Sequence, residues 1–225
     1  MDTTQTVRLT ADGARLAGQL SVPRGSSALV VLVSGGCGLG RAERENRIVD
    51  LLRRQGIATL QIDLVAVDER PSRAVRLDVD LLSDRLAGIL VWLGTDDRTA
   101  SLTRGFCGVD TGAAAVLQTL SPSDVAGEAA VFLDGRVDLA ACDLGAMALP
   151  ALFVADTSHE HLADITREGY SSLGTEPGDK NILWATEGPD IVFTTTAWFS
   201  HYLPSPGAGT DAQPGADLAR AESHD

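Results

Sequence analysis

The stretch Gly108-Val109-Asp110-Thr111-Gly112, followed by Ala113-Ala114-Ala115, decides the fold of this chain. A β-like run over residues 102–107 leads into it, and helix-forming residues 112–120 continue from it. Glycines on both sides of a central residue are typical of a sharp strand–turn–helix connection, because the backbone is strained and strand and helix pack too closely for a Cβ. We call residues 108–112 the elbow. Asp110 stands at its apex, beside a predicted helix N-terminus that favours a negative charge.

Strand-like and helix-like segments alternate along the rest of the chain, which predicts a mostly parallel sheet covered on both faces. The other predicted strands cover residues 6–9, 15–22, 28–33, 57–62, 129–133, 151–155 and 181–185. The other predicted helices cover residues 43–55, 81–93, 160–173 and 194–203. Residues 28–33 are continuously apolar, as expected of a buried parallel strand, whereas residues 63–76 read as a long charged loop.

The composition favours one folded domain. The chain has 225 residues, of which 44% are hydrophobic, enough for the core of a single α/β domain. We expect this domain to cover residues 1–203, with residues 204–225 as a disordered tail, because that stretch is rich in Pro, Gly, Ala and Asp. No apolar run approaches the ~20 residues of a membrane span, and residues 1–11 lack a signal-peptide core.

Charge and cysteine content limit the partners and the compartment. The net charge of −13 repels nucleic acid and anionic membranes, so we expect neither as a partner. The three cysteines form no Cys-x-x-Cys pair, which favours free thiols in a reducing cytoplasm. We expect a small-molecule substrate, no cofactor and no metal, and leave a homodimer open.

The order of these elements resembles the α/β-hydrolase fold and, more narrowly, the small dienelactone-hydrolase-like proteins. The resemblance depends on Val33-Ser34-Gly35-Gly36-Cys37-Gly38 after an early strand, on the Asn46-Arg47 pair, and on the elbow with its alanines. It covers roughly residues 15–203. It implies an α/β-hydrolase-like three-layer sandwich with a central, mostly parallel sheet of about seven or eight strands and no large cap domain.

The same resemblance implies a Ser/His/Asp triad, from which this chain departs. Asp110 occupies the nucleophile position, and Ile191 occupies the histidine position. The acid position falls near Ser158, with Asp156 two residues earlier. A serine-hydrolase mechanism is therefore not expected, and the triad is degenerate.

Asp110 has three interpretations. It could be a carboxylate nucleophile that forms an ester intermediate, as in the epoxide hydrolase and haloalkane dehalogenase branches of the fold. It could instead be a general acid or base. The alternative without function is that Asp110 only caps the following helix.

Other candidates surround the elbow. The resemblance implies backbone oxyanion donors at Thr111 and in the Gly36-Cys37 segment, although these glycines could serve only a turn. It also assigns positions that line a substrate site to Ser34, Gly35 and Ile191.

Four charged or titratable residues complete the candidate set. His159 and His161 could activate water, or could lie at a solvated helix start. Asp190 could face Asp110 across a pocket, so that one of two carboxylates is the acid, or it could belong to a polar loop. Arg76 could hold a substrate carboxylate, or could pair with Asp78.

The leading hypothesis from the sequence is a cofactor-independent enzyme acting on a small, largely apolar organic substrate. Asp110 would act as acid or base in a ring opening, cyclisation, dehydration or isomerisation. A second hypothesis is an Asp-nucleophile hydrolase of the epoxide or haloalkane type, assisted by His159 or His161. A third is a catalytically silent ligand-binding or scaffold protein.

Overall fold

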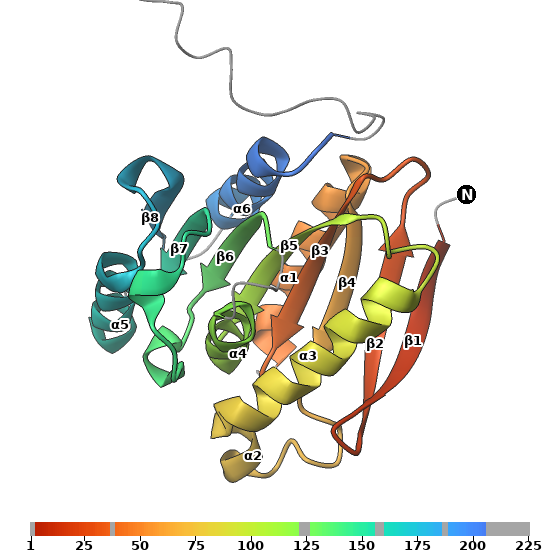
Figure 1. Ribbon diagram of the computed structural model, residues 1–225, viewed down its shortest axis with the longest axis horizontal. Helices are drawn as coiled ribbons and strands as arrows, with labels where there is room; N and C mark the ends of the chain where they lie inside the picture. Colours follow the sequence, from red (N-terminus) through yellow and green to blue (C-terminus); the bar gives the residue numbers. More distant parts are fainter. Residues whose placement is uncertain (1–2, 37–38, 122–126, 156–159, 186–188, 206–225) are drawn as a thin grey trace, which may run out of the picture.

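The computed structural model describes residues 3–36, 39–121, 127–155, 160–185 and 189–205. Eight strands form one sheet in the order β1-β2-β4-β3-β5-β6-β7-β8 (Figure 1). The strands are β1 (Thr3–Ala11), β2 (Ala14–Val22), β3 (Ala28–Ser34), β4 (Ala58–Asp63), β5 (Thr103–Val109), β6 (Ala129–Leu133), β7 (Ala151–Ala155) and β8 (Lys180–Trp184).

The sheet is parallel from β4 to β8 in spatial order, and only the β1–β2 and β2–β4 pairs are antiparallel. At the carboxyl edge of the sheet, Asp63, Ser34 and Val109 lie side by side. Asp63 pairs in register with Ser34, and Ser34 pairs with Val109. Asp110 follows Val109, so the elbow lies at the carboxyl edge of the central strands. Ligands of open α/β sheets bind at this edge.

Helices cover both faces of the sheet (Figure 1). The helices are α1 (Leu39–Arg54), α2 (Arg73–Leu77), α3 (Val79–Thr95), α4 (Thr111–Leu120), α5 (Glu160–Ser172) and α6 (Pro189–Tyr202). Short 3₁₀ helices cover Val137–Leu139, Leu144–Ala146 and Pro177–Asp179. One apolar cluster joins the sheet to α3, α4 and α5, and a second joins it to α1 and α6. This is the predicted three-layer sandwich, without a large cap.

Strand β3 shows why the apolar run produces this architecture. Leu29, Val31 and Val33 belong to the first cluster, whereas Val30 and Leu32 belong to the second. Successive strand residues point to opposite faces, and both faces of a parallel sheet are covered. The continuous apolar run is therefore explained by two cores, one on each side.

Two segments differ from the sequence expectations. The loop predicted over residues 63–76 contains the start of α2, whose first turn is capped by the Ser72 side chain. Helix α6 begins at Pro189, five residues before the predicted start, because Pro at the first helical position and an acidic first turn favour helix initiation. The expectation that Asp190 and Ile191 lie in a loop was wrong.

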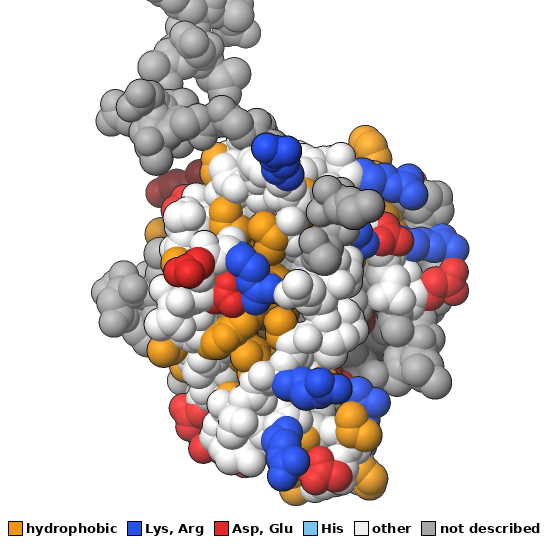
Figure 2. Space-filling view, turned by 90° about the vertical axis from the view of Figure 1, so that its right-hand side faces the viewer, with side chains coloured by type: hydrophobic (Ala, Val, Ile, Leu, Met, Phe, Trp, Pro, Cys, Tyr) orange, Lys and Arg blue, Asp and Glu red, His pale blue; other side chains and the backbone are white. Residues whose placement is uncertain are grey.

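The predicted tail falls almost wholly outside the described residues. Its first two residues, Pro204 and Ser205, are held by Ser27, whose hydroxyl donates to both carbonyls at 3.0 and 2.8 Å. In the described part of the chain, no helix is long and apolar enough to cross a membrane. Figure 2 shows one side of the molecule, on which basic side chains lie among acidic ones, so the net charge of −13 is not spread as a uniform acidic surface.

Candidate functional site

The backbone of Asp110 is strained and held in place. Its φ is 54° and its ψ is −126°, outside the regions that non-glycine residues ordinarily adopt. The Asp110 N–H donates to the Leu133 carbonyl at 3.2 Å, and the Asp110 carbonyl accepts from the Arg136 N–H at 3.0 Å. Strain of this kind persists only where the surroundings impose it, and it concentrates at functional sites.

The elbow glycines are required by close packing, as the sequence pattern predicts. A Cβ on Gly108 would lie 2.5 Å from Ala113 Cα, and one on Gly112 would lie 2.6 Å from the Val33 carbonyl oxygen. A Cβ on Gly35 would overlap the Thr111 side chain. Helix α4 therefore packs directly against β5 and the end of β3, and this contact fixes the apex at the edge of the sheet.

The Asp110 carboxylate forms no hydrogen bond or ion pair with the described residues. It is half-buried, and it accepts no capping hydrogen bond from helix α4. The nearby Arg136 guanidinium is held by Asp138 through hydrogen bonds of 2.9 and 2.8 Å. The pKa of Arg136 is raised, first by the hydrogen bond to Asp138 and in smaller part by the charges of Asp138 and Asp110. A positive charge thus lies near the apex without pairing with Asp110.

The backbone donors predicted for an oxyanion differ in availability. The Gly36 N–H donates to Asp63 Oδ1 at 2.9 Å. The Thr111 N–H has no acceptor among the described residues, and the Thr111 hydroxyl donates to the Gly35 carbonyl at 3.3 Å. Cys37 lies outside the described residues.

Asp63, at the end of β4, joins the loop after β3 to the loop after β4. Its Oδ1 also accepts from the Val65 N–H at 3.0 Å, and its Oδ2 accepts from Arg70 Nη2 at 3.3 Å. Burial nevertheless raises the pKa of Asp63, since these favourable contacts only partly offset desolvation.

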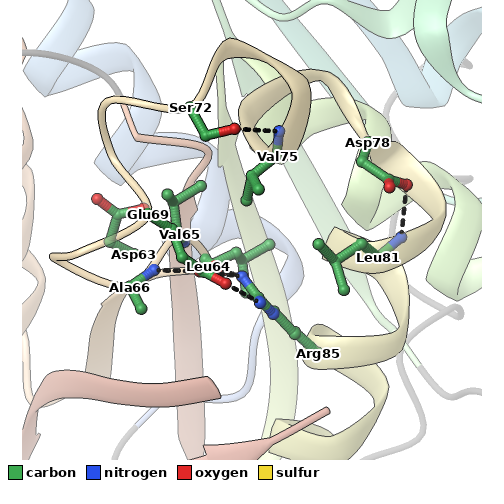
Figure 3. A network of polar contacts seen from close by, with 10 residues as sticks. All are labelled: Asp63, Leu64, Val65, Ala66, Glu69, Ser72, Val75, Asp78, Leu81 and Arg85. Atoms are coloured by element: carbon green, nitrogen blue, oxygen red, sulfur yellow. Dashed lines mark hydrogen bonds and ion pairs between the residues drawn. The ribbon is translucent and has the colours of Figure 1, made fainter. Parts of the chain in front are cut away.

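A partly buried ion pair between Arg85 and Glu69 anchors the loop after β4 to helix α3 (Figure 3). Both Arg85 Nη atoms donate to Glu69 at 2.7 Å, and Nη1 also donates to the Leu64 carbonyl at 2.8 Å. Glu69 Oε2 accepts in addition from the Ala66 N–H at 3.0 Å. The sequence analysis missed Asp63, Glu69 and Arg85. The available signal was Arg85 itself, a charge on the inward face between Leu82 and Ile89.

Arg76 lies at the end of α2, with its side chain across the turn after β3. Gly36 has φ +83°, and a Cβ there would lie 3.0 Å from Arg76 Cδ. The buried Arg76 Nε has no hydrogen-bond partner, and the guanidinium forms no ion pair within the described part of the chain. The alternative pairing with Asp78 is not found, because Asp78 caps α3 through the Leu81 N–H at 3.1 Å.

A second aspartate with positive φ lies beside the elbow. Val109 and Leu133 are in register on β5 and β6, so Asp110 and Asp134 follow paired residues. Asp134 has φ 47°, is buried, and accepts from Arg44 Nη1 of helix α1 at 3.0 Å. Neither Asp134 nor Arg44 was among the residues predicted for the site.

The remaining predicted site residues are spread over several elements. Ser34 is half-buried at the end of β3. His161 is exposed in the first turn of α5, and Asp190 is exposed in the first turn of α6. Ile191 is buried in the cluster beneath α1 and α6. His159 lies outside the described residues. Within the described ranges, no group of three or more His, Cys, Asp or Glu side chains could hold a metal ion.

The fold is that of the α/β-hydrolases. No family model matches the sequence. The dienelactone hydrolase from Anabaena variabilis is 26% identical, with a TM-score of 0.80 over 90% of this chain and 99% of that one. Est1E from Butyrivibrio proteoclasticus is 12% identical, with a TM-score of 0.69 over 87% of this chain and 97% of that one. An esterase from an Arctic intertidal metagenomic library, 17% identical, has a TM-score of 0.68 over 91% of this chain and 98% of that one.

Two strains of Mycobacterium tuberculosis have a protein named "Putative phosphoribosyl transferase" that is 30% identical to this chain over 211 residues. The matched segment is 89% of this chain but 47% of the relative. The chain therefore spans about half the length of the curated relatives it matches.

Proposed function

We propose that this chain is an enzyme in which Asp110 exchanges a proton with a small, largely apolar organic substrate. The observation that carries the proposal is the uncommitted Asp110 carboxylate on a strained apex. A carboxylate that only capped helix α4 would accept one of its N–H groups, and Asp110 accepts none. Strained backbone held by its surroundings is typical of functional positions.

The chemistry of a lone carboxylate at this place is proton transfer. Asp110 would take a proton from a C–H or O–H group and return it to another atom of the same substrate, which covers ring opening, cyclisation, dehydration and isomerisation. A positioned acid or base contributes about 10²–10⁴-fold to the rate. No cofactor is needed for such a step.

Arg76 is the residue that we propose to hold an anionic group of the substrate. A guanidinium presents a rigid fork that matches a carboxylate. The Arg76 guanidinium has no ionic partner among the described residues, and its stem lies on Gly36. We place Ser34 and Gly35 in the lining of the same site, as the resemblance implies.

An Asp-nucleophile hydrolase is the second candidate, favoured by the position of Asp110 at the apex and by the Thr111 N–H, which has no acceptor within the described part of the chain. Hydrolysis of the enzyme ester also needs a base and oxyanion donors. Two features weigh against it. The Gly36 N–H is already bound by Asp63, and His161 is exposed on α5.

The name of the mycobacterial relatives points to a different reaction, transfer of a phosphoribosyl group. We infer that this activity belongs to the part of those proteins outside the match. The support is that the match covers 47% of their length, whereas 90% of this chain aligns in structure with a dienelactone hydrolase. Function follows the site rather than a shared name.

Deuterium exchange tests the proposal without knowledge of the full reaction. The protein is incubated in D₂O with a panel of γ-lactones, β-keto esters and cyclic ketones, each with and without a carboxylate, and proton loss is followed by NMR. Wild type should exchange at least one compound, and Asp110→Asn should be slower by about 10²–10⁴-fold. The control is Asp97→Asn, an exposed aspartate whose side chain forms no hydrogen bond or ion pair in the described ranges.

Two results would overturn the proposal. One is equal exchange by wild type and Asp110→Asn. The other is no exchange of any compound above the buffer rate, which would favour the catalytically silent alternative.

A further inference from the structure

Asp63 is joined by hydrogen bonds to two loops that approach the elbow. Its Oδ1 accepts from Gly36 N–H at 2.9 Å in the turn after β3, and from Val65 N–H at 3.0 Å in the loop after β4. Its Oδ2 accepts from Arg70 Nη2 at 3.3 Å. One carboxylate thus links these two loops.

The turn at Gly36 carries more than its own backbone. Gly36 has φ +83°, which only glycine adopts readily, and Arg76 Cδ lies 3.0 Å from the place where a Cβ would stand. Arg76 itself belongs to the segment that follows Asp63 in the chain. A shift of Gly36 away from Asp63 would therefore remove the surface on which the Arg76 side chain rests.

The far side of the same loop is fixed independently. Glu69 and Arg85 tie it to helix α3, and Ser72 caps α2 (Figure 3). The segment before α2 is consequently held at Glu69. Asp63, together with the Leu64 N–H that donates to the Ser34 carbonyl at 2.9 Å, connects this segment to the end of β3 and its turn. Loss of the Asp63 contacts should loosen the turn without unfolding the loop.

The charge of Asp63 is not explained by stability alone. Burial raises its pKa, so the ionised form is disfavoured in the folded protein relative to water. An asparagine could accept the same two N–H hydrogen bonds without that penalty. A residue that is less favourable for stability than an available alternative is often kept for function.

We propose that Asp63 is the positioning residue of the site, which holds the Gly36 turn against the loop after β4 so that Arg76 lies across Gly36 with its guanidinium unpaired among the described residues. The same contact keeps the Gly36 N–H from acting as an oxyanion donor, which directs the site away from acyl transfer. The role of Asp63 in the site rests on the proposed function, whereas its role in holding the Gly36 turn does not.

Amide hydrogen exchange measured by NMR tests the inference on the protein itself. In Asp63→Ala, the Gly36 and Val65 amides should exchange about 10- to 100-fold faster, because a hydrogen bond to a charged acceptor is lost. Amides of the central strands, such as those of Phe106 and Val131, should not change. Asp63→Asn should stay close to wild type, since its side-chain oxygen can accept the same bonds. The matched control is Asp68→Ala, an exposed aspartate of the same loop whose side chain forms no hydrogen bond or ion pair with the described residues.

Unchanged Gly36 exchange in Asp63→Ala would overturn the inference, as would uniform acceleration of all amides. If Asp63→Ala does not fold, Arg70→Gln serves as a second variant and should speed Gly36 exchange modestly. With a substrate from the deuterium panel, Asp63→Ala should raise KM more than it lowers kcat, and Asp68→Ala should change neither. If no compound of the panel is exchanged, the proposed function is wrong, but the amide exchange of Gly36 still tests the role of Asp63. The two proposals can therefore fail separately.

Discussion

The Asp110 carbonyl oxygen accepts a hydrogen bond from the Arg136 N–H at 3.0 Å, which ties the apex of the elbow to the segment after β6. The Asp110 N–H is bound on its other side by Leu133 at 3.2 Å. The unusual φ of Asp110 is therefore imposed by the scaffold and does not depend on its carboxylate. Substitution of the side chain alone should leave the elbow in place, which makes tests at this position interpretable.

The elbow glycines should tolerate no side chain. Gly108→Ala places a Cβ 2.5 Å from Ala113 Cα, so we expect destabilisation of at least about 1–3 kcal/mol, as for overpacked cores. Gly178→Ala is the control, because no atom lies within 4 Å of a Cβ there. Urea unfolding measures both. A Gly108→Ala protein as stable as the control would show that the close approach of α4 is wrong.

The chain should not act as a serine hydrolase. The resemblance implies a serine at the apex, where Asp110 stands, and a histidine at the position of Ile191, which is buried in α6. We expect no appreciable turnover of p-nitrophenyl acetate and no labelling by fluorophosphonates. Rapid turnover that a single Ser→Ala change abolishes would contradict this prediction.

The elbow and the sheet could be predicted from sequence because their signals are local. Glycine spacing at residues 108–112 reports a strained turn, and the apolar run of β3 reports a strand covered on both faces. The start of α6 was missed because the run over residues 188–193 was interpreted as the loop that carries the histidine position of the resembling family. Pro189 and the acidic Asp190 were therefore not used as signals of a helix start.

The partners of the site could not be predicted, since they come together only in the folded chain. Asp63 and Gly36 are 27 residues apart and meet because β3 and β4 are neighbours. Asp134 lies next to Asp110 through strand order alone. The predicted roles of Cys37 and His159 concern residues outside the described structure, and those roles remain predictions.

The stability contribution of Asp63 should depend on pH in a defined direction. Its pKa in the folded protein is raised above the ordinary value of 3.8, so its contribution is fully present below that value and is lost as pH rises through the folded pKa. Arg70 is the charged group that it contacts. The unfolding free energy of wild type minus that of Asp63→Asn should therefore decrease from low pH toward neutrality. Urea titrations across this range measure it, and an increase with pH would contradict the assignment.

The partly buried Arg85–Glu69 pair should be worth far more than an exposed pair. Glu69→Ala leaves the Arg85 side chain, 3% exposed, without its carboxylate, and we expect a loss toward the lower end of about 3–5 kcal/mol because Glu69 itself is 27% exposed. Glu43→Ala breaks the exposed pair with Arg47 and should cost below about 1 kcal/mol. Equal losses in urea unfolding would mean that the loop is not anchored by this pair.

A single turnover in H₂¹⁸O, followed by mass spectrometry of the peptide that contains Asp110, tests the central claim most directly. The substrate is the compound of the deuterium panel that the protein converts to product fastest, and enzyme is in excess. If Asp110 only transfers a proton, the substrate is consumed and no ¹⁸O enters the peptide. If Asp110 forms an ester, water attacks its carbonyl carbon and leaves one ¹⁸O in the carboxylate. An unlabelled Asp110 after complete turnover is the predicted result, and a labelled one would contradict the acid–base account.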